Sequence, residues 1–120
     1  MNSIERAHLS LSGLSVGDAL GETFCRPNSE AMSTIARRQV PAGPWHYTDD
    51  TQMAISIVEL LQSAGHIDPH LLGQSFAKRY EAHRGYGPST AKLLEAVTGG
   101  ADAQATASAS HGGEGSYGSG

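Results

Sequence analysis

Two adjacent carboxylates flanked by hydroxyls form the segment Thr48-Asp49-Asp50-Thr51. Carboxylate and hydroxyl oxygens are hard ligands of the kind that Mg²⁺ and Mn²⁺ prefer, and about six surround each ion, several commonly from water. Thr48, Asp49 and Asp50 could therefore supply part of one coordination shell. Helix capping is the competing role, because Asp49 and Gln52 have the spacing of a capping box. Two neighbouring carboxylates exceed what one cap requires, since successive helical side chains point about 100° apart.

Helical patterns surround this segment and must position it. Apolar residues at Met53, Ile57, Leu60 and Ala64 predict a helix that begins at the carboxylates and stops at Gly65. An earlier apolar stripe predicts a helix over residues 4–20. Asp18 occupies the next position of that stripe, so a second carboxylate is expected at or near the buried face.

Three glycines, Gly13, Gly17 and Gly21, line another face of the first predicted helix. Their spacing of four favours either a close approach of a second backbone or a softened helix end, since each glycine costs about 1 kcal/mol relative to alanine. Both alternatives stay open at the level of the sequence.

The rest of the chain also reads as helical. Asp68-Pro69 predicts a helix start and Gly85 its end, a shorter helix around Leu93 and Val97 stops at Gly99, and a weaker pattern covers residues 30–38. No segment with large side chains alternates as a half-buried strand does. We therefore predict an all-α fold, an orthogonal multi-helix bundle. Residues 101–120, rich in Ala, Gly and Ser, are expected to form a loop or tail.

Length, charge and cysteine content narrow the function. A chain of 120 residues holds at most one domain, and its net charge of −4 argues against a nucleic-acid surface. The single cysteine, Cys25, excludes an intramolecular disulfide, and no histidine has metal-ligand spacing with it. No leader pattern and no apolar run of membrane length occurs. We expect a soluble, cytoplasmic protein without a membrane partner.

Four motifs in chain order carry a resemblance to a known family. They are GLSVGDALGETF at 13–24, YTDDTQMAISIVELL at 47–61, HRGYGPSTAKLL at 83–94 and GSYGSG at 115–120. Together they resemble the ADP-ribosylglycohydrolases, relatives of the dinitrogenase-reductase-activating glycohydrolase. The resemblance implies metal-dependent hydrolysis of the N- or O-glycosidic bond between ADP-ribose and an acceptor, with two Mg²⁺ or Mn²⁺ ions in the complete domain. The implied partner is ADP-ribose or an ADP-ribosylated substrate.

The same resemblance implies roles for individual residues. Thr48, Asp49 and Asp50 match the first metal-binding motif, and Asp49 and Asp50 are thereby implied in catalysis. Substrate-binding residues that it implies are Asp18, Gly115, Ser116, Tyr117 and Gly118. The glycine loop would hold the distal ribose and phosphates, with Tyr117 near the adenine.

Two departures from the family pattern matter. Family members often carry a glutamate where this sequence has Cys25, while Glu22 follows the GDALG element directly. Either Glu22 takes the catalytic role from a shifted register, or the role is absent.

The second departure is the lack of the family's late Asp-Thr-Asp motif. Residues 1–120 are therefore expected to be the N-terminal part of a longer domain, with an incomplete site and an exposed apolar surface. Missing C-terminal helices, or an equivalent partner, would cover that surface. The alternative function is a non-enzymatic helical module of the same lineage that binds ADP-ribose or serves a structural purpose.

Overall fold

A computed structural model describes residues 1–25 and 29–115. Its α-helices are α1 (Ser3–Glu22), α2 (Ser29–Ala36), α3 (Asp49–Ala64), α4 (Pro69–Arg79), α5 (Pro88–Thr98) and α6 (Ala103–Ser108), and the 3₁₀ turns are η1 (Ala82–Arg84) and η2 (Ser110–Gly113). No strand occurs within the described ranges, so the all-α prediction is confirmed. None of the helices in these ranges has the length and apolar character needed to cross a membrane.

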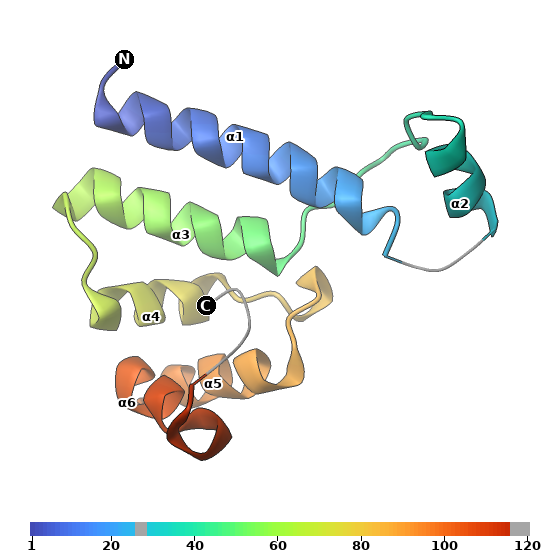
Figure 1. Cartoon of the computed structure of the whole chain (residues 1–120). Helices are drawn as coiled ribbons and strands as arrows, with labels where there is room; N and C mark the ends of the chain where they lie inside the picture. Colours follow the sequence, from blue (N-terminus) through green and yellow to red (C-terminus); the bar gives the residue numbers. More distant parts are fainter. Residues whose placement is uncertain (26–28, 116–120) are drawn as a thin grey trace.

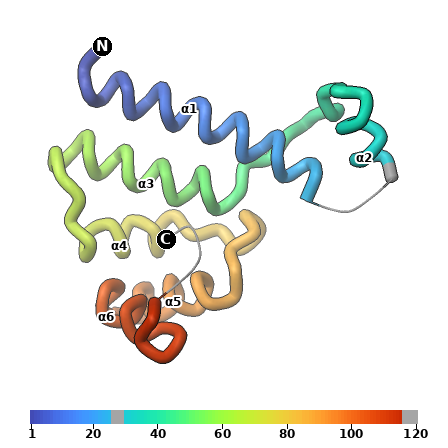
Figure 2. The backbone as a smooth tube through the Cα atoms, in the orientation of Figure 1, coloured from blue at the N-terminus to red at the C-terminus, as the bar shows by residue number. Residues whose placement is uncertain are grey.

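The helices pack in a simple order that places α3 in the middle. One side of α3 contacts α1 and another contacts α4, and α4 in turn packs on α5 and α6 (Figure 1). α2 lies beyond the end of α1, away from the other helices (Figure 1). The backbone trace brings the start of α3 beside the second half of α1 (Figure 2). Elements from both sides can therefore hold the first turn of α3.

Local signals set the helix ends. Asn2 and Glu5 form a reciprocal capping box at the start of α1, with N···O distances of 2.7 and 2.9 Å. Asp68 accepts from the Leu71 N–H at 2.9 Å at the start of α4, as the Asp-Pro signal predicts. Gly65 ends α3 with φ +75°, a left-handed conformation that glycine adopts without a Cβ clash. The predicted helix from 68 to 85 is shorter, because α4 ends at Arg79 and η1 follows it.

The core is concentrated on α3 and α5. Leu94 is fully buried, and Met53, Val58, Leu60 and Val97 are each at most 9% exposed. α1 contributes far less, since its apolar residues Leu9 and Val16 are 63% and 58% exposed.

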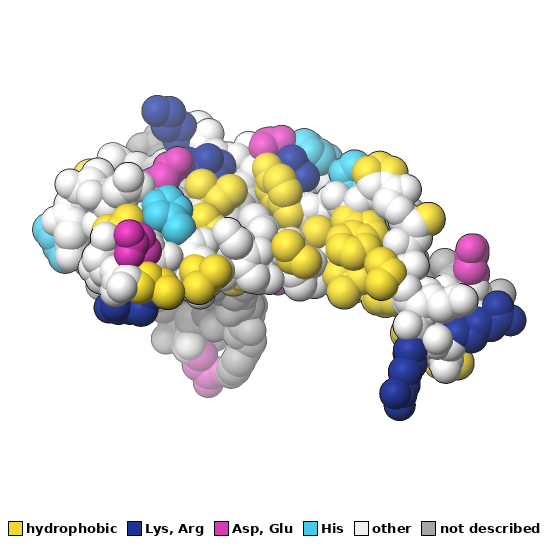
Figure 3. Space-filling view, turned by 90° about the horizontal axis from the view of Figure 1, so that it is seen from above, with side chains coloured by type: hydrophobic (Ala, Val, Ile, Leu, Met, Phe, Trp, Pro, Cys, Tyr) yellow, Lys and Arg dark blue, Asp and Glu magenta, His cyan; other side chains and the backbone are white. Residues whose placement is uncertain are grey.

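The face of the molecule that α1 occupies carries several patches of hydrophobic side chains (Figure 3). The expected exposure of apolar surface is therefore found along α1. Its glycines are equally open, because a Cβ added at Gly13, Gly17 or Gly21 would meet no described atom within 4 Å. The close approach of a second backbone is not made by any described segment.

The expected loop or tail at residues 101–120 is wrong for its first part, because Ala103–Ser108 form α6. Asp102 caps this helix by accepting from the Ala105 N–H at 2.7 Å. Small side chains let α6 approach α4, and a Cβ added at Gly73 would lie 2.3 Å from the Ala103 Cβ. The composition that suggested a tail instead permits close helix packing.

Candidate functional site

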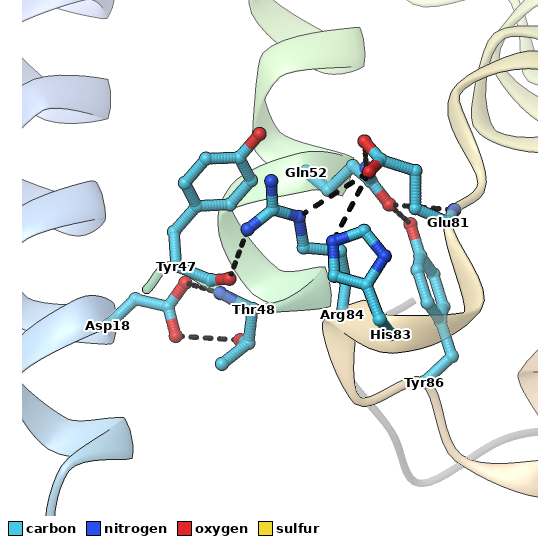
Figure 4. A network of polar contacts seen from close by, with 8 residues as sticks. All are labelled: Asp18, Tyr47, Thr48, Gln52, Glu81, His83, Arg84 and Tyr86. Carbon is cyan, nitrogen blue, oxygen red and sulfur yellow. Dashed lines mark hydrogen bonds and ion pairs between the residues drawn. The ribbon is translucent and has the colours of Figure 1, made fainter. Parts of the chain in front are cut away.

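Asp18 of α1 holds the first turn of α3 through both of its carboxylate oxygens. Oδ2 accepts from the Thr48 N–H at 2.8 Å, and Oδ1 accepts from the Thr48 hydroxyl at 2.6 Å (Figure 4). Thr51 adds its hydroxyl at 2.6 Å and its N–H at 3.3 Å, both to Oδ2. Asp18, which the apolar stripe predicted near the buried face, therefore binds the Thr-Asp-Asp-Thr segment thirty residues later in the chain.

Thr48 is the N-cap of α3, and its hydroxyl accepts from the Asp50 N–H at 3.3 Å. The predicted capping box of Asp49 with Gln52 is wrong, because Thr48 and Asp18 already provide this function. Asp49 is half-buried and Asp50 is exposed at the mouth of the helix. Neither carboxylate is needed as the cap.

The environments of Asp18 and Asp49 shift their acidities in opposite directions. Burial is the largest effect on Asp18 and opposes its ionisation, but the hydrogen bonds from Thr48 and Thr51 together lower its pKa. Burial raises the pKa of Asp49, and the neighbouring charge of Asp50 raises it further. Asp18 is therefore stabilised as an anion within the protein, whereas burial and the charge of Asp50 disfavour the ionised form of Asp49.

These donors fit a hard divalent cation as part of its coordination shell. Since the Thr48 hydroxyl proton points to Asp18, a lone pair on Oγ1 remains for an ion. The N-terminal end of a helix carries a partial positive charge of roughly half an elementary charge. The two negative charges of Asp49 and Asp50 together exceed it, so the start of α3 can still attract a cation. No group of three His, Cys, Asp or Glu side chains that could hold a metal occurs among residues 1–25 and 29–115. The described residues therefore fit part of a metal site only.

A second polar cluster holds α3 from the other side. Gln52 is 1% exposed, and its Nε2 donates to Glu81 Oε1 at 2.8 Å (Figure 4). Its Oε1 accepts from the Tyr86 hydroxyl at 2.7 Å and from the Glu81 N–H at 3.3 Å. The side-chain amide of Gln52 thus links α3 to the turn at 81–86.

Burial raises the pKa of Tyr86 to about 12, and the charge of Asp49 adds to the shift. The Tyr86 hydroxyl therefore stays protonated and donates to Gln52 throughout the neutral range.

Arg84 joins this cluster to the residue before the cap. Its NH1 donates to the Tyr47 carbonyl oxygen at 3.2 Å, and its Cζ lies 3.7 Å from the centre of the Tyr47 ring. Glu81 Oε2 lies 4.0 Å from Arg84 Nε, a buried atom without a hydrogen-bond partner. The Arg84 side chain is 16% exposed.

Sequence reasoning missed this second cluster. Gln52 and Ser56 stand four residues apart on the buried side of α3. Two polar residues among the apolar positions of this helix were the one sequence feature that could have indicated buried polar partners. The partners of Gln52 follow some thirty positions later, at a distance where local patterns carry no pairing information.

The remaining predicted site residues either lie apart from the start of α3 or fall outside the described residues. Glu22 is exposed at the last position of α1, four residues after Asp18 and hence on the same side of that helix. Gly115 follows η2, which contacts α6, and has φ +81°. Ser116, Tyr117 and Gly118 lie outside the described residues. Of the predicted set, the structure brings together Asp18 and the Thr48-Asp49-Asp50 segment.

Comparison with known proteins adds to this geometry. The sequence model of the family described as ADP-ribosylglycohydrolase matches residues 1–120. The chain is also 31% identical over 81 residues to the ADP-ribosylarginine hydrolase Tri1 of Serratia proteamaculans (strain 568), an alignment that covers 65% of this chain. That alignment spans 22% of the relative's length. No solved structure matches the chain.

Proposed function

The chain belongs to the ADP-ribosylglycohydrolase family, and from this premise we propose that it supplies part of a metal-dependent site for hydrolysis of the glycosidic bond between ADP-ribose and an acceptor. One observation carries the proposal. Asp18 fixes Thr48 with hydrogen bonds of 2.6 and 2.8 Å, while Asp49 and Asp50 stand at the mouth of α3 without being required as its cap.

The ligands that we propose are Thr48, Asp49 and Asp50, bound to Mg²⁺ or Mn²⁺. An ion bound there would supply orientation of the ribose hydroxyls and of a water at the anomeric carbon. Asp18 serves this site indirectly, because it accepts hydrogen bonds from the hydroxyls of Thr48 and Thr51. A lone pair of the Thr48 hydroxyl oxygen is then left for the ion. The raised pKa of Asp49 is consistent with a carboxylate whose charge a cation would balance.

We also propose an arginine-linked ADP-ribose as the substrate, on the strength of the name of the Serratia relative. The bond cleaved would then be an N-glycosidic bond to a guanidinium nitrogen. A comparison of ADP-ribosylated arginine with ADP-ribosylated serine as substrates tests this choice. Faster release of ADP-ribose from serine would contradict it.

The rest of the site is proposed to come from outside residues 1–120. The aligned part spans 22% of the Serratia relative, and α1 carries exposed apolar side chains that further helices of the same domain, or an equivalent partner, would cover. In this proposal Gly115 to Gly118 contact the distal ribose and phosphates.

A non-enzymatic ADP-ribose-binding module is the second candidate. Cys25 favours it, because this residue stands where family members often have glutamate, is exposed, and directs its thiol to the Gly21 carbonyl oxygen at 3.6 Å. A thiol in that arrangement supplies no carboxylate for catalysis. If the chain forms part of a hydrolase, Glu22 would have to supply the catalytic carboxylate instead.

Calorimetric titration with ADP-ribose, with and without Mn²⁺, separates the two candidates. We expect binding that depends on Mn²⁺ and that Asp50→Asn abolishes. Asp68→Asn is the matched control, because it makes the same substitution at the N-cap of α4, which follows the opposite end of α3. Binding that is equally strong without metal would favour the non-enzymatic module. Absence of binding in both conditions, here and in a longer chain that includes the further helices, would contradict a ligand site formed by these residues.

A further inference from the structure

The peptide group between Tyr47 and Thr48 is held at both of its ends. Its carbonyl oxygen accepts from Arg84 NH1 at 3.2 Å, and its N–H donates to Asp18 Oδ2 at 2.8 Å. These partners come from opposite sides of the α3 mouth, Asp18 from α1 and Arg84 from η1 (Figure 4). A peptide group is planar, so fixing the directions of its C=O and N–H fixes the plane from which the Thr48 side chain departs.

Arg84 is itself held firmly enough to serve as a fixed support. Its guanidinium stacks on the Tyr47 ring at 3.7 Å and lies near Glu81, whose other oxygen accepts from Gln52. Gln52 belongs to the first turn of α3, and its N–H donates to the Thr48 carbonyl oxygen at 3.1 Å. The turn at 81–86 therefore contacts the chain on both sides of the Asp49-Asp50 pair, at Tyr47 before α3 and at Gln52 within it.

We propose that Arg84 is a positioning residue for the divalent-ion ligands Thr48, Asp49 and Asp50, with Glu81 and Gln52 as its support. This inference rests on the function proposed above. Arg84 orients the Tyr47–Thr48 peptide and thereby the direction in which the Thr48 hydroxyl and the two carboxylates leave the helix start. Its side chain is 16% exposed and stacks on Tyr47, so it orients the ligands without binding the ion itself.

The direction in which the affinity for a divalent cation changes when Arg84 is replaced distinguishes positioning from simple electrostatics. Arg84→Gln removes a positive charge beside the mouth and leaves Glu81 without this cation. On Coulombic grounds alone, a divalent cation would then bind more tightly. If Arg84 positions the ligands, the same substitution weakens binding, by about tenfold, as is typical when a residue that orients metal ligands is lost.

Arg79→Gln provides the matched control. Arg79 also ties a neighbouring element to α3, through Ser56 Oγ at 3.2 Å and through Glu59, but it does so beyond the first turn. Both substitutions remove one positive charge and contacts to α3 or to the segment that leads into it. A purely structural role predicts that the two variants lose thermal stability without any specific change at the α3 mouth.

The experiment measures amide hydrogen exchange and Mn²⁺ affinity for the wild-type chain and both variants. We expect Arg84→Gln to accelerate exchange at the Thr48 and Thr51 amides and to weaken Mn²⁺ binding, while Arg79→Gln leaves both unchanged. Unchanged exchange in Arg84→Gln, or tighter Mn²⁺ binding, would overturn the inference. If the wild-type chain binds no Mn²⁺, these ligands do not hold an ion by themselves, and the exchange data alone then decide the role of Arg84. Arg84→Lys keeps the charge but not the planar fork, so electrostatics alone predicts an unchanged Mn²⁺ affinity for this variant. If Arg84→Gln does not fold, weaker Mn²⁺ binding and faster amide exchange in Arg84→Lys support positioning, and unchanged values overturn it.

Discussion

Replacement of Asp18 by asparagine removes the charge that joins α1 to the start of α3. The carboxylate accepts four hydrogen bonds from Thr48 and Thr51. A hydrogen bond to a charged group contributes about 1.5–3 kcal/mol and one to a neutral group about 0.5–1.5, and asparagine can present only one oxygen. Because Asp18 is half-buried and water can replace part of the loss, we expect a destabilisation of about 2 kcal/mol.

Thermal unfolding followed by circular dichroism, in the presence of a chelator, measures this effect. For a domain of this size, about 2 kcal/mol corresponds to a Tm lower by roughly 10 °C. Asp68→Asn is the control, since Asp68 makes a local cap in which a single oxygen accepts from Leu71, and asparagine caps helices about as well as aspartate. Its Tm should stay close to that of the wild type.

Equal Tm values for Asp18→Asn and the wild type would contradict this prediction. They would mean that the hydrogen bonds between α1 and the start of α3 contribute no net stability. A drop of similar size in Asp68→Asn would also contradict it, because the effect would then follow from removing any aspartate.

Three other sets of substitutions test the metal site, the helix packing and the cap of α4. Asp49→Ala and Asp50→Ala should each weaken Mn²⁺ binding while the circular-dichroism spectrum stays folded, whereas loss of folding in both would indicate a structural role. Gly73→Ala should destabilise the chain by about 1–3 kcal/mol in chemical unfolding, because the added methyl overlaps α6, while Gly13→Ala, on an open helix face, should stabilise it by about 1 kcal/mol. Hydrogen bonding to the Leu71 amide lowers the pKa of Asp68, so its contribution to stability is present above its ordinary value of 3.8 and is lost as the pH falls through the lowered folded value. The Tm of the wild type should therefore fall more steeply with acid than that of Asp68→Asn, and parallel curves would contradict this.

Local sequence signals predicted those parts of the fold that local physics determines. Gly65 ends α3 because glycine adopts φ +75° readily, and Asp68 caps α4 through its own backbone three residues on. The apolar stripe of α1 correctly placed Asp18 near a packed face. Each of these features depends on residues within a single helix or at its ends.

The features that the sequence predicted wrongly or did not predict depend on contacts between residues that are distant in the chain. Thr48 became the cap in place of Asp49 because Asp18, thirty positions earlier, binds it. Gln52 acquired partners at Glu81 and Tyr86 rather than at the backbone of its own first turn. Helix α6 was missed because an Ala-rich segment has no apolar stripe of large side chains, and its packing depends on the absence of a side chain at Gly73.

Titration of the isotope-labelled chain with Mn²⁺, observed through the amide resonances, tests whether Thr48, Asp49 and Asp50 are the metal ligands. The paramagnetic ion broadens resonances close to its site, and we predict that broadening begins at Thr48, Asp49 and Asp50 and disappears in Asp50→Asn. Broadening that begins elsewhere in the chain, or that persists unchanged in Asp50→Asn, would contradict the assignment of these residues as the metal ligands.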